Sequence, residues 1–71
     1  MTNTIINKVK TIINREGGFR ERELLKAKNL EFFKGDTWNA EHKIIDVLGD
    51  AEPDGYRPGC RVDIQTGKIC G

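Results

Sequence analysis

The most regular pattern along the chain is a helical repeat of apolar residues near the N-terminus. The apolar positions are Ile5, Ile6, Val9, Ile12 and Ile13. This spacing places them on one face of an α-helix, and Asn, Lys and Thr residues occupy the opposite face. Thr2 or Asn3 can cap the start, and Gly17 and Gly18 suit the end. The pattern predicts an amphipathic helix over about residues 3–15, and its β-branched content means that tertiary packing must hold it.

The segment that follows fits two patterns. Residues 20–28 contain good helix formers with an apolar side. Leu24, Leu30 and Phe32 also share the parity that a strand would give them. We therefore predict a short helix to Lys28, followed by a strand or turn that contains the two adjacent phenylalanines.

The next element is predicted to be a second well-defined helix over residues 37–48. An Asp-Thr pair offers an N-cap, and Gly49 can close the helix. Trp38 and Ile45 lie on one helical line and would face the core. A strand over residues 44–48 is the alternative, because Ile-Ile-Asp-Val-Leu is rich in residues that favour strands.

The C-terminal part of the chain predicts a loop and a hairpin. Residues 49–59 read GDAEPDGYRPG, and the Asp-Gly and Pro-Gly pairs are strong turn signals. The segment 60–70 then predicts a β-hairpin whose turn lies at residues 65–67. Gly67 suits the left-handed position of a three-residue hairpin loop.

The two cysteines are expected to be free. In the predicted hairpin, Ile64 pairs with Lys68 and Val62 pairs with Cys70, so that Cys60 lies diagonal to Cys70 on the same face. Diagonal neighbours in a sheet are roughly 7–8 Å apart, which is beyond comfortable disulfide reach. The register therefore predicts two buried free thiols packed with Val62 and Ile64.

Length and composition limit the fold class. The chain has 71 residues, of which 37% are hydrophobic and 32% are charged. These values predict one small globular domain, residues 1–71, of the α+β class. Helices followed by a hairpin are also the order of elements in a winged-helix domain. Apolar runs never exceed two residues and the N-terminus lacks a signal-peptide pattern, so we expect no membrane association and a cytoplasmic location.

Charge is divided unevenly between the two halves of the chain. Residues 1–34 carry eight basic and four acidic side chains, whereas residues 35–71 carry four basic and seven acidic ones. The formal net charge of +1 conceals this asymmetry. An uneven charge distribution bears on partners and on association kinetics, and it says nothing about the fold.

The basic half suggests a nucleic-acid-binding module as an alternative function. Its candidate contacts are Lys8, Lys10, Arg15, Arg20, Arg22, Lys26 and Lys28. In a winged-helix arrangement, residues 37–48 would enter the groove of DNA, but Glu41 and Asp46 on that segment oppose phosphate binding. The sequence pI of about 7.8 is also well below the usual value for such domains.

A second alternative is a divalent-cation site in the acidic loop over residues 50–63. Asp50, Glu52 and Asp54, followed by Gly55, resemble the first half of an EF-hand calcium loop. The pattern then departs from that family, because its twelfth position is Arg61 where a bidentate Glu should close the shell. A solvated acidic turn explains the same residues.

Catalytic residue sets are sparse in this sequence. The chain contains no serine, one histidine (His42) and two cysteines without the C-x-x-C spacing typical of zinc sites. No glycine-rich phosphate loop of known spacing occurs. We therefore predict that the protein is not an enzyme and that it needs no cofactor.

The remaining hypothesis is a small non-catalytic binding protein that acts on a protein partner, as an inhibitor or adaptor. Phe33 neighbours Phe32, and adjacent residues on a strand point to opposite faces, so one of the two is expected to be exposed. Tyr56 and Arg57 lie in the Pro/Gly-rich loop and are residue types that often anchor interfaces. Phe33, Tyr56 and Arg57 are therefore the predicted contacts for a protein partner or for a homodimer.

Overall fold

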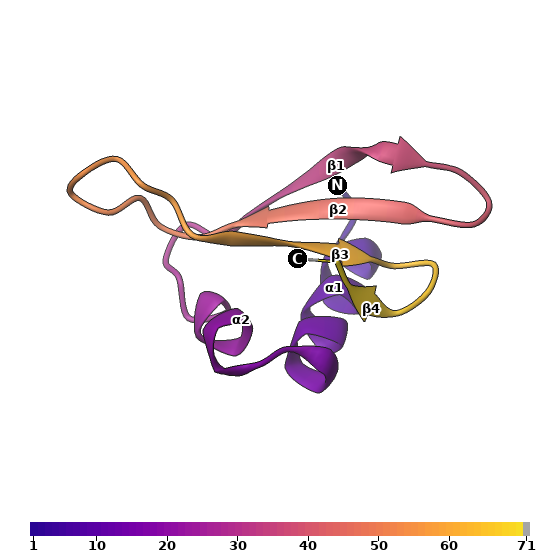
Figure 1. Ribbon diagram of the computed structural model, residues 1–71, viewed down its shortest axis with the longest axis horizontal. Helices are drawn as coiled ribbons and strands as arrows, with labels where there is room; N and C mark the ends of the chain where they lie inside the picture. Colours follow the sequence, from indigo (N-terminus) through magenta and orange to yellow (C-terminus); the bar gives the residue numbers. More distant parts are fainter. Residues whose placement is uncertain (71) are drawn as a thin grey trace.

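Two helices cover one face of a four-stranded antiparallel sheet (Figure 1), in a computed structural model that describes residues 1–70. The strands follow one another in the order β1-β2-β3-β4. The α+β class predicted from the sequence is confirmed. The elements are α1 (Asn3–Glu16), α2 (Phe19–Leu24), β1 (Glu31–Trp38), β2 (Lys43–Leu48), β3 (Gly59–Asp63) and β4 (Lys68–Ile69).

Helix α1 forms where the apolar repeat predicts it. The Thr2 hydroxyl caps the start by accepting a hydrogen bond from the backbone N–H of Ile5 at 3.3 Å. At the other end, the N–H of Gly17 donates to the carbonyl of Ile13 at 2.9 Å. A Cβ on Gly17 would lie 2.4 Å from that same carbonyl oxygen, so the close approach requires glycine.

The core lies between α1 and one face of the sheet. Side chains alternate across a strand, so every second residue of β2 and β3 points toward the helices. Leu24 from α2 and Ile64 from the last hairpin complete this layer. Its buried members are Val9, Ile12, Ile13, Leu24, Ile45, Val47, Cys60, Val62 and Ile64.

The predicted helix over residues 37–48 is wrong, and the strand alternative for residues 44–48 is confirmed. Between β1 and β2 the chain turns at Asn39, whose side-chain oxygen accepts hydrogen bonds from the N–H groups of Glu41 and His42 at 2.8 and 2.7 Å. Ile45 faces the core as expected, but it does so with strand alternation. Without this helix, the winged-helix order is not found within residues 1–70.

Helix α2 is shorter than the sequence predicts. It ends at Leu24, and the N–H of Ala27 already bonds to the carbonyl of Leu24 in a tighter turn. The chain is then held by Asp50, whose carboxylate accepts hydrogen bonds from the N–H groups of Lys28 and Asn29 at 2.9 and 2.8 Å. This long-range contact ends the helical segment before Lys28 and directs the chain into β1.

The final hairpin differs from its predicted register by one residue. Val62 pairs with Ile69 and Asp63 with Lys68, and the N–H of Cys70 donates to the carbonyl of Arg61 at 2.8 Å. A one-residue slip moves a side chain to the other face of the sheet. Both cysteines are free as predicted, but only one is buried, because Cys70 is exposed.

The register has a local physical cause. Ile64 is buried in the core, and the Asp63 carboxylate accepts hydrogen bonds from the N–H groups of Gln65 and Thr66 at 2.9 and 3.3 Å. These contacts close a turn that includes Ile64, one residue longer than predicted. Gly67 does adopt the left-handed conformation expected for it, with a φ of 76°.

Truncation of Ile13 tests how much the single apolar layer contributes to the free energy of unfolding. Ile13 is fully buried between α1 and the sheet, so Ile13→Ala should lower the free energy of unfolding by about 2–4 kcal/mol. Urea denaturation at neutral pH measures this loss. The exposed Asn14→Ala variant is the control and should change stability by less than about 0.5 kcal/mol. Equal losses in the two variants would contradict this account of the core.

Candidate functional site

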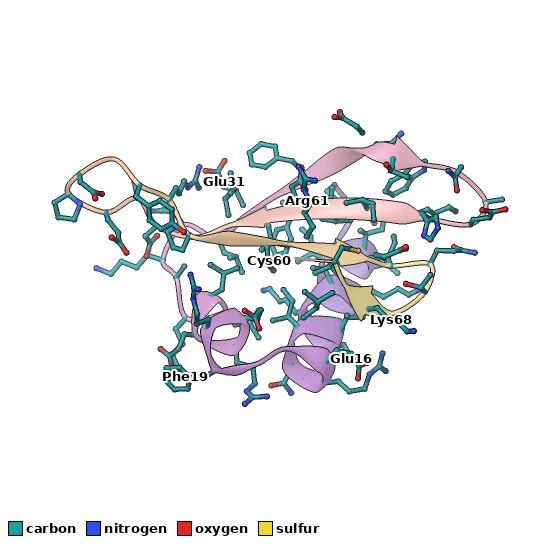
Figure 2. All side chains as sticks on the ribbon, viewed as in Figure 1. Glu16, Phe19, Glu31, Cys60, Arg61 and Lys68 are labelled. Atoms are coloured by element: carbon teal, nitrogen blue, oxygen red, sulfur yellow. The ribbon has the colours of Figure 1, made fainter. Side chains whose placement is uncertain are left out.

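The face of the sheet opposite α1 and α2 is not covered by any element within residues 1–70 (Figure 1). Phe33 pairs with Asp46, and Asp46 pairs with Arg61, so these side chains form a row across the sheet. In Figure 2, Arg61 projects away from the helices, whereas Cys60 lies on the helix side. We call this surface, which comprises Phe33, Asp46, Leu48, Arg61 and Cys70, the open face.

A groove of about 620 Å³ lies on the open face. Phe33 is 45% exposed and Tyr56 is 54% exposed at its edges. The structure therefore brings the three predicted partner contacts, Phe33, Tyr56 and Arg57, to one depression. Its full lining is Phe33, Asp46, Leu48, Tyr56, Arg57, Gly59, Cys60, Arg61 and Cys70.

Arg57 lines the groove, but its guanidinium is used inside the molecule. Its Nε donates to the carbonyl of Gly49 at 2.5 Å, and Nη2 donates to the carbonyl of Asn29 at 3.3 Å. The same Nη2 forms an ion pair with Glu31. These contacts fasten the loop after β2 to the start of β1, so Arg57 positions Tyr56 and is not a free cation.

Arg61 is the cation of the groove that the sequence analysis missed. Its side chain is 69% exposed, and its Nε lies 3.1 Å from Oδ1 of Asp46. That oxygen is buried and has no hydrogen-bonding partner, because the alignment with Arg61 is that of a charge contact and not of a hydrogen bond. The flanking apolar residues Cys60 and Val62 are the sequence signal that places Arg61 on the outer side of β3.

The basic residues of the alternative function gather on the helix side of the molecule. All seven of them are exposed. Two pair with acidic neighbours, Arg15 with Glu16 at 3.5 Å and Lys26 with Glu23 at 3.1 Å. The guanidinium of Arg22 donates to the carbonyl of Gly17 at 2.7 Å. The basic surface and the groove therefore lie on opposite sides of the sheet.

The carboxylates of the acidic loop do not converge on one point within residues 1–70. Both oxygens of Asp50 accept backbone hydrogen bonds from the segment after α2, and these bonds lower the pKa of its carboxyl. Asp54 accepts a hydrogen bond from the N–H of Tyr56 at 2.9 Å and shapes its own turn. Within residues 1–70, no three His, Cys, Asp or Glu side chains come close enough to hold a metal ion, so Asp50, Glu52 and Asp54 are not gathered.

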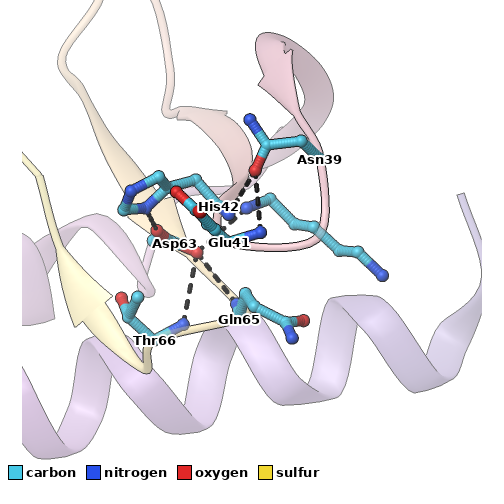
Figure 3. A network of polar contacts seen from close by, with 7 residues as sticks. Asn39, Glu41, His42, Asp63, Gln65 and Thr66 are labelled. Atoms are coloured by element: carbon cyan, nitrogen blue, oxygen red, sulfur yellow. Dashed lines mark hydrogen bonds and ion pairs between the residues drawn. The ribbon is translucent and has the colours of Figure 1, made fainter.

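His42 and Asp63 form the most connected polar contact in the molecule (Figure 3). The Asp63 side chain is only 2% exposed, and its Oδ2 lies 2.7 Å from Nδ1 of His42. Its Oδ1 accepts hydrogen bonds from the N–H of Lys43 at 3.0 Å and from the N–H groups of Gln65 and Thr66. The carboxylate thus ties the β1–β2 turn to the β3–β4 turn, which is a structural role.

The electrostatics of this network favour ionised Asp63. Burial alone would raise its pKa, but the hydrogen bonds from Lys43, His42, Gln65 and Thr66 together hold the pKa of the carboxyl well below its usual range.

At Cys60 the pKa is shifted in the other direction, upward. Burial, reinforced by the charge of Glu21, raises the pKa of its thiol to about 11, so the thiol stays protonated and unreactive at neutral pH.

Comparisons with protein-family models, with curated proteins and with solved structures found no match to this chain. Within residues 1–70, no helix combines the length and the hydrophobicity needed to cross a membrane.

The Asp63 network predicts a pH dependence of stability. Because the folded-state pKa of Asp63 is depressed, its contribution is present above the unfolded-state pKa of about 3.9 and is lost as the pH falls below that value. Asp63→Asn should cost about 1–3 kcal/mol at pH 7 and should make the protein less sensitive to acid. Urea unfolding at pH 7 and pH 3 measures both effects. An equal acid sensitivity of the variant and the wild type would contradict the assigned role.

Proposed function

We propose that the protein is a small non-catalytic binding protein whose open face docks on a protein partner. The observation that carries this proposal is the groove on the side of the sheet without helices, with exposed Phe33 and Tyr56 beside Arg61. Aromatic residues and arginine are the residue types most enriched where interfaces gain their binding energy. A partner that covers this face would lie where a second layer of structure would pack on the sheet.

The composition of the open face supports a docking role. Antiparallel sheets with one solvated face usually present polar residues there, but this face carries Phe33 and Leu48 within the groove.

Contacts within the chain also hold the groove in place. Arg57 fastens the loop that carries Tyr56, and the strands beneath are paired in the sheet. An ordered surface loses little conformational entropy when it binds, which favours affinity. A rigid recognition surface on so small a chain suits an inhibitor or an adaptor, and a second copy of the chain is a further occupant to be tested.

Replacement of Phe33 by Lys tests this function, because it exchanges an exposed aromatic contact of the groove for a charge, which should prevent docking. Immobilised wild-type protein is expected to retain a partner from an extract of the source cells, and Phe33→Lys should retain at least about tenfold less, which corresponds to about 1.4 kcal/mol. Quantitative mass spectrometry of the retained proteins measures the ratio.

The matched control is Phe19→Lys, because Phe19 is 75% exposed on the helix side. A partner lost from both variants, or retained by both, would contradict the proposal. Sedimentation of the wild type and of each variant tests whether the occupant of the open face is a second copy of the chain. A dimer that Phe33→Lys alone converts to a monomer would identify the occupant as a second copy.

Nucleic-acid binding is the second candidate function, and one observation favours it. The solvent-facing side of α1 offers lysine, asparagine, threonine and arginine side chains, with no carboxylate before Glu16. These are the side-chain types that contact phosphate and sugar groups. Lys8 and Lys10 have no acidic partner within 4 Å among residues 1–70.

If α1 binds phosphate groups, affinity for a DNA duplex should fall steeply with salt, and a Lys8→Gln/Lys10→Gln double variant should reduce the slope of log K against log salt by about 2. Fluorescence anisotropy with a labelled duplex at several salt concentrations measures this slope. Lys43→Gln on β2 is the control and should leave the slope unchanged. The absence of binding at low salt, or equal slopes in all three proteins, would rule out this function for α1.

A further inference from the structure

The orientation of Arg61 indicates what kind of partner the open face recognises. Asp46 lies against the Nε edge of the guanidinium, at 3.1 Å. Within residues 1–70, the ion pair with Asp46 is the only polar contact of the Arg61 guanidinium, and it involves Nε and neither terminal nitrogen. The planar guanidinium has five N–H donors, and its outer edge matches the two oxygens of a carboxylate. Arg61 therefore keeps a donor edge beside the groove that no other group within residues 1–70 uses.

The groove beside Arg61 includes three large apolar or aromatic side chains. Phe33 and Leu48 lie on strands β1 and β2, and Tyr56 lies on the adjacent loop. A volume of about 620 Å³ is in the range of pockets that hold a small organic group. An aromatic side chain of a partner can occupy this space while a neighbouring charged group reaches Arg61.

Asp46 limits the charge that this position accepts. Its carboxylate already balances the charge of Arg61, so the site has no excess positive charge to offset the larger desolvation cost of a dianionic phosphate. A chain-terminal carboxylate is usually held by converging backbone N–H groups. Strands β2 and β3 are paired with neighbours on both sides, so their N–H groups serve the sheet. These features favour the side-chain carboxylate of an Asp or Glu.

We propose that the open face binds a protein segment in which an Asp or Glu side chain stands next to an aromatic residue. The aromatic ring fills the groove between Phe33, Leu48 and Tyr56, and the carboxylate accepts two hydrogen bonds from the outer edge of Arg61. This inference rests on the proposed protein-binding function of the same face. It adds the chemistry of the partner and gives Arg61 the specificity-determining role.

The test compares two dipeptide probes by amide NMR of the labelled full chain. Acetyl-Glu-Phe-amide should shift the signals of the groove residues, and acetyl-Gln-Phe-amide should bind about tenfold more weakly because it lacks the charge. Arg61→Gln should remove this difference. Asp46→Asn should strengthen binding of the Glu probe, since the opposing charge is gone. Lys10→Gln on α1 is the control and should leave both affinities unchanged.

Several results of this titration would contradict the proposed role of Arg61. Equal affinity for the two dipeptides, or shifts that survive Arg61→Gln unchanged, would overturn the carboxylate role of Arg61. The same conclusion follows if neither dipeptide shifts the groove signals at millimolar concentration, or if phenyl phosphate binds more tightly than the Glu probe. The proposed function is judged separately, because loss of a partner on Phe33→Lys requires no acidic contact.

Discussion

One apolar contact layer, α1 against β2 and β3, holds this molecule together. Val9, Ile12 and Ile13 of the helix meet the alternate residues of the two central strands. A single helical layer can cover only one face of a sheet, so the other face stays in solvent (Figure 1). The location of the groove is therefore a direct consequence of how the core is built, and a partner on that face would occupy the place of a second layer.

Charged side chains hold the turns and loops that the small apolar core does not contact. Asp63 joins two turns at one end of the sheet, and Asp50 holds the segment that leads into β1. Arg57 fastens the Tyr56 loop to the start of the same strand. These ties explain why acidic residues in turns need not signal a metal site. They also keep the rim of the groove in one arrangement, which lowers the entropic cost of binding.

The uneven charge of the sequence gives the folded molecule two sides of different charge. The basic residues lie on the helix side, while the open face carries balanced pairs, Asp46 with Arg61 and Glu31 with Arg57. The groove thus has nearly no net charge and discriminates through the donor edge of Arg61 and its aromatic rim. The helix side would act through long-range attraction of anions, which salt screens. Because the groove is nearly neutral and the helix side is basic, separate substitutions can test the two surfaces.

The sequence by itself determined α1 and the α+β class, because helical periodicity is local, and it limited the cap of α1 to Thr2 or Asn3. It also indicated that one of Phe32 and Phe33 is exposed, since adjacent residues on a strand point to opposite faces, and it selected Tyr56 by its residue type and its place in a turn-rich loop. Only the tertiary structure decided that residues 43–48 form a strand, because pairing with β1 and β3 selects between two patterns that both fit locally. The face of Cys70 and the roles of Arg57 and Arg61 likewise depend on register and on contacts between residues distant in sequence, which no local pattern encodes.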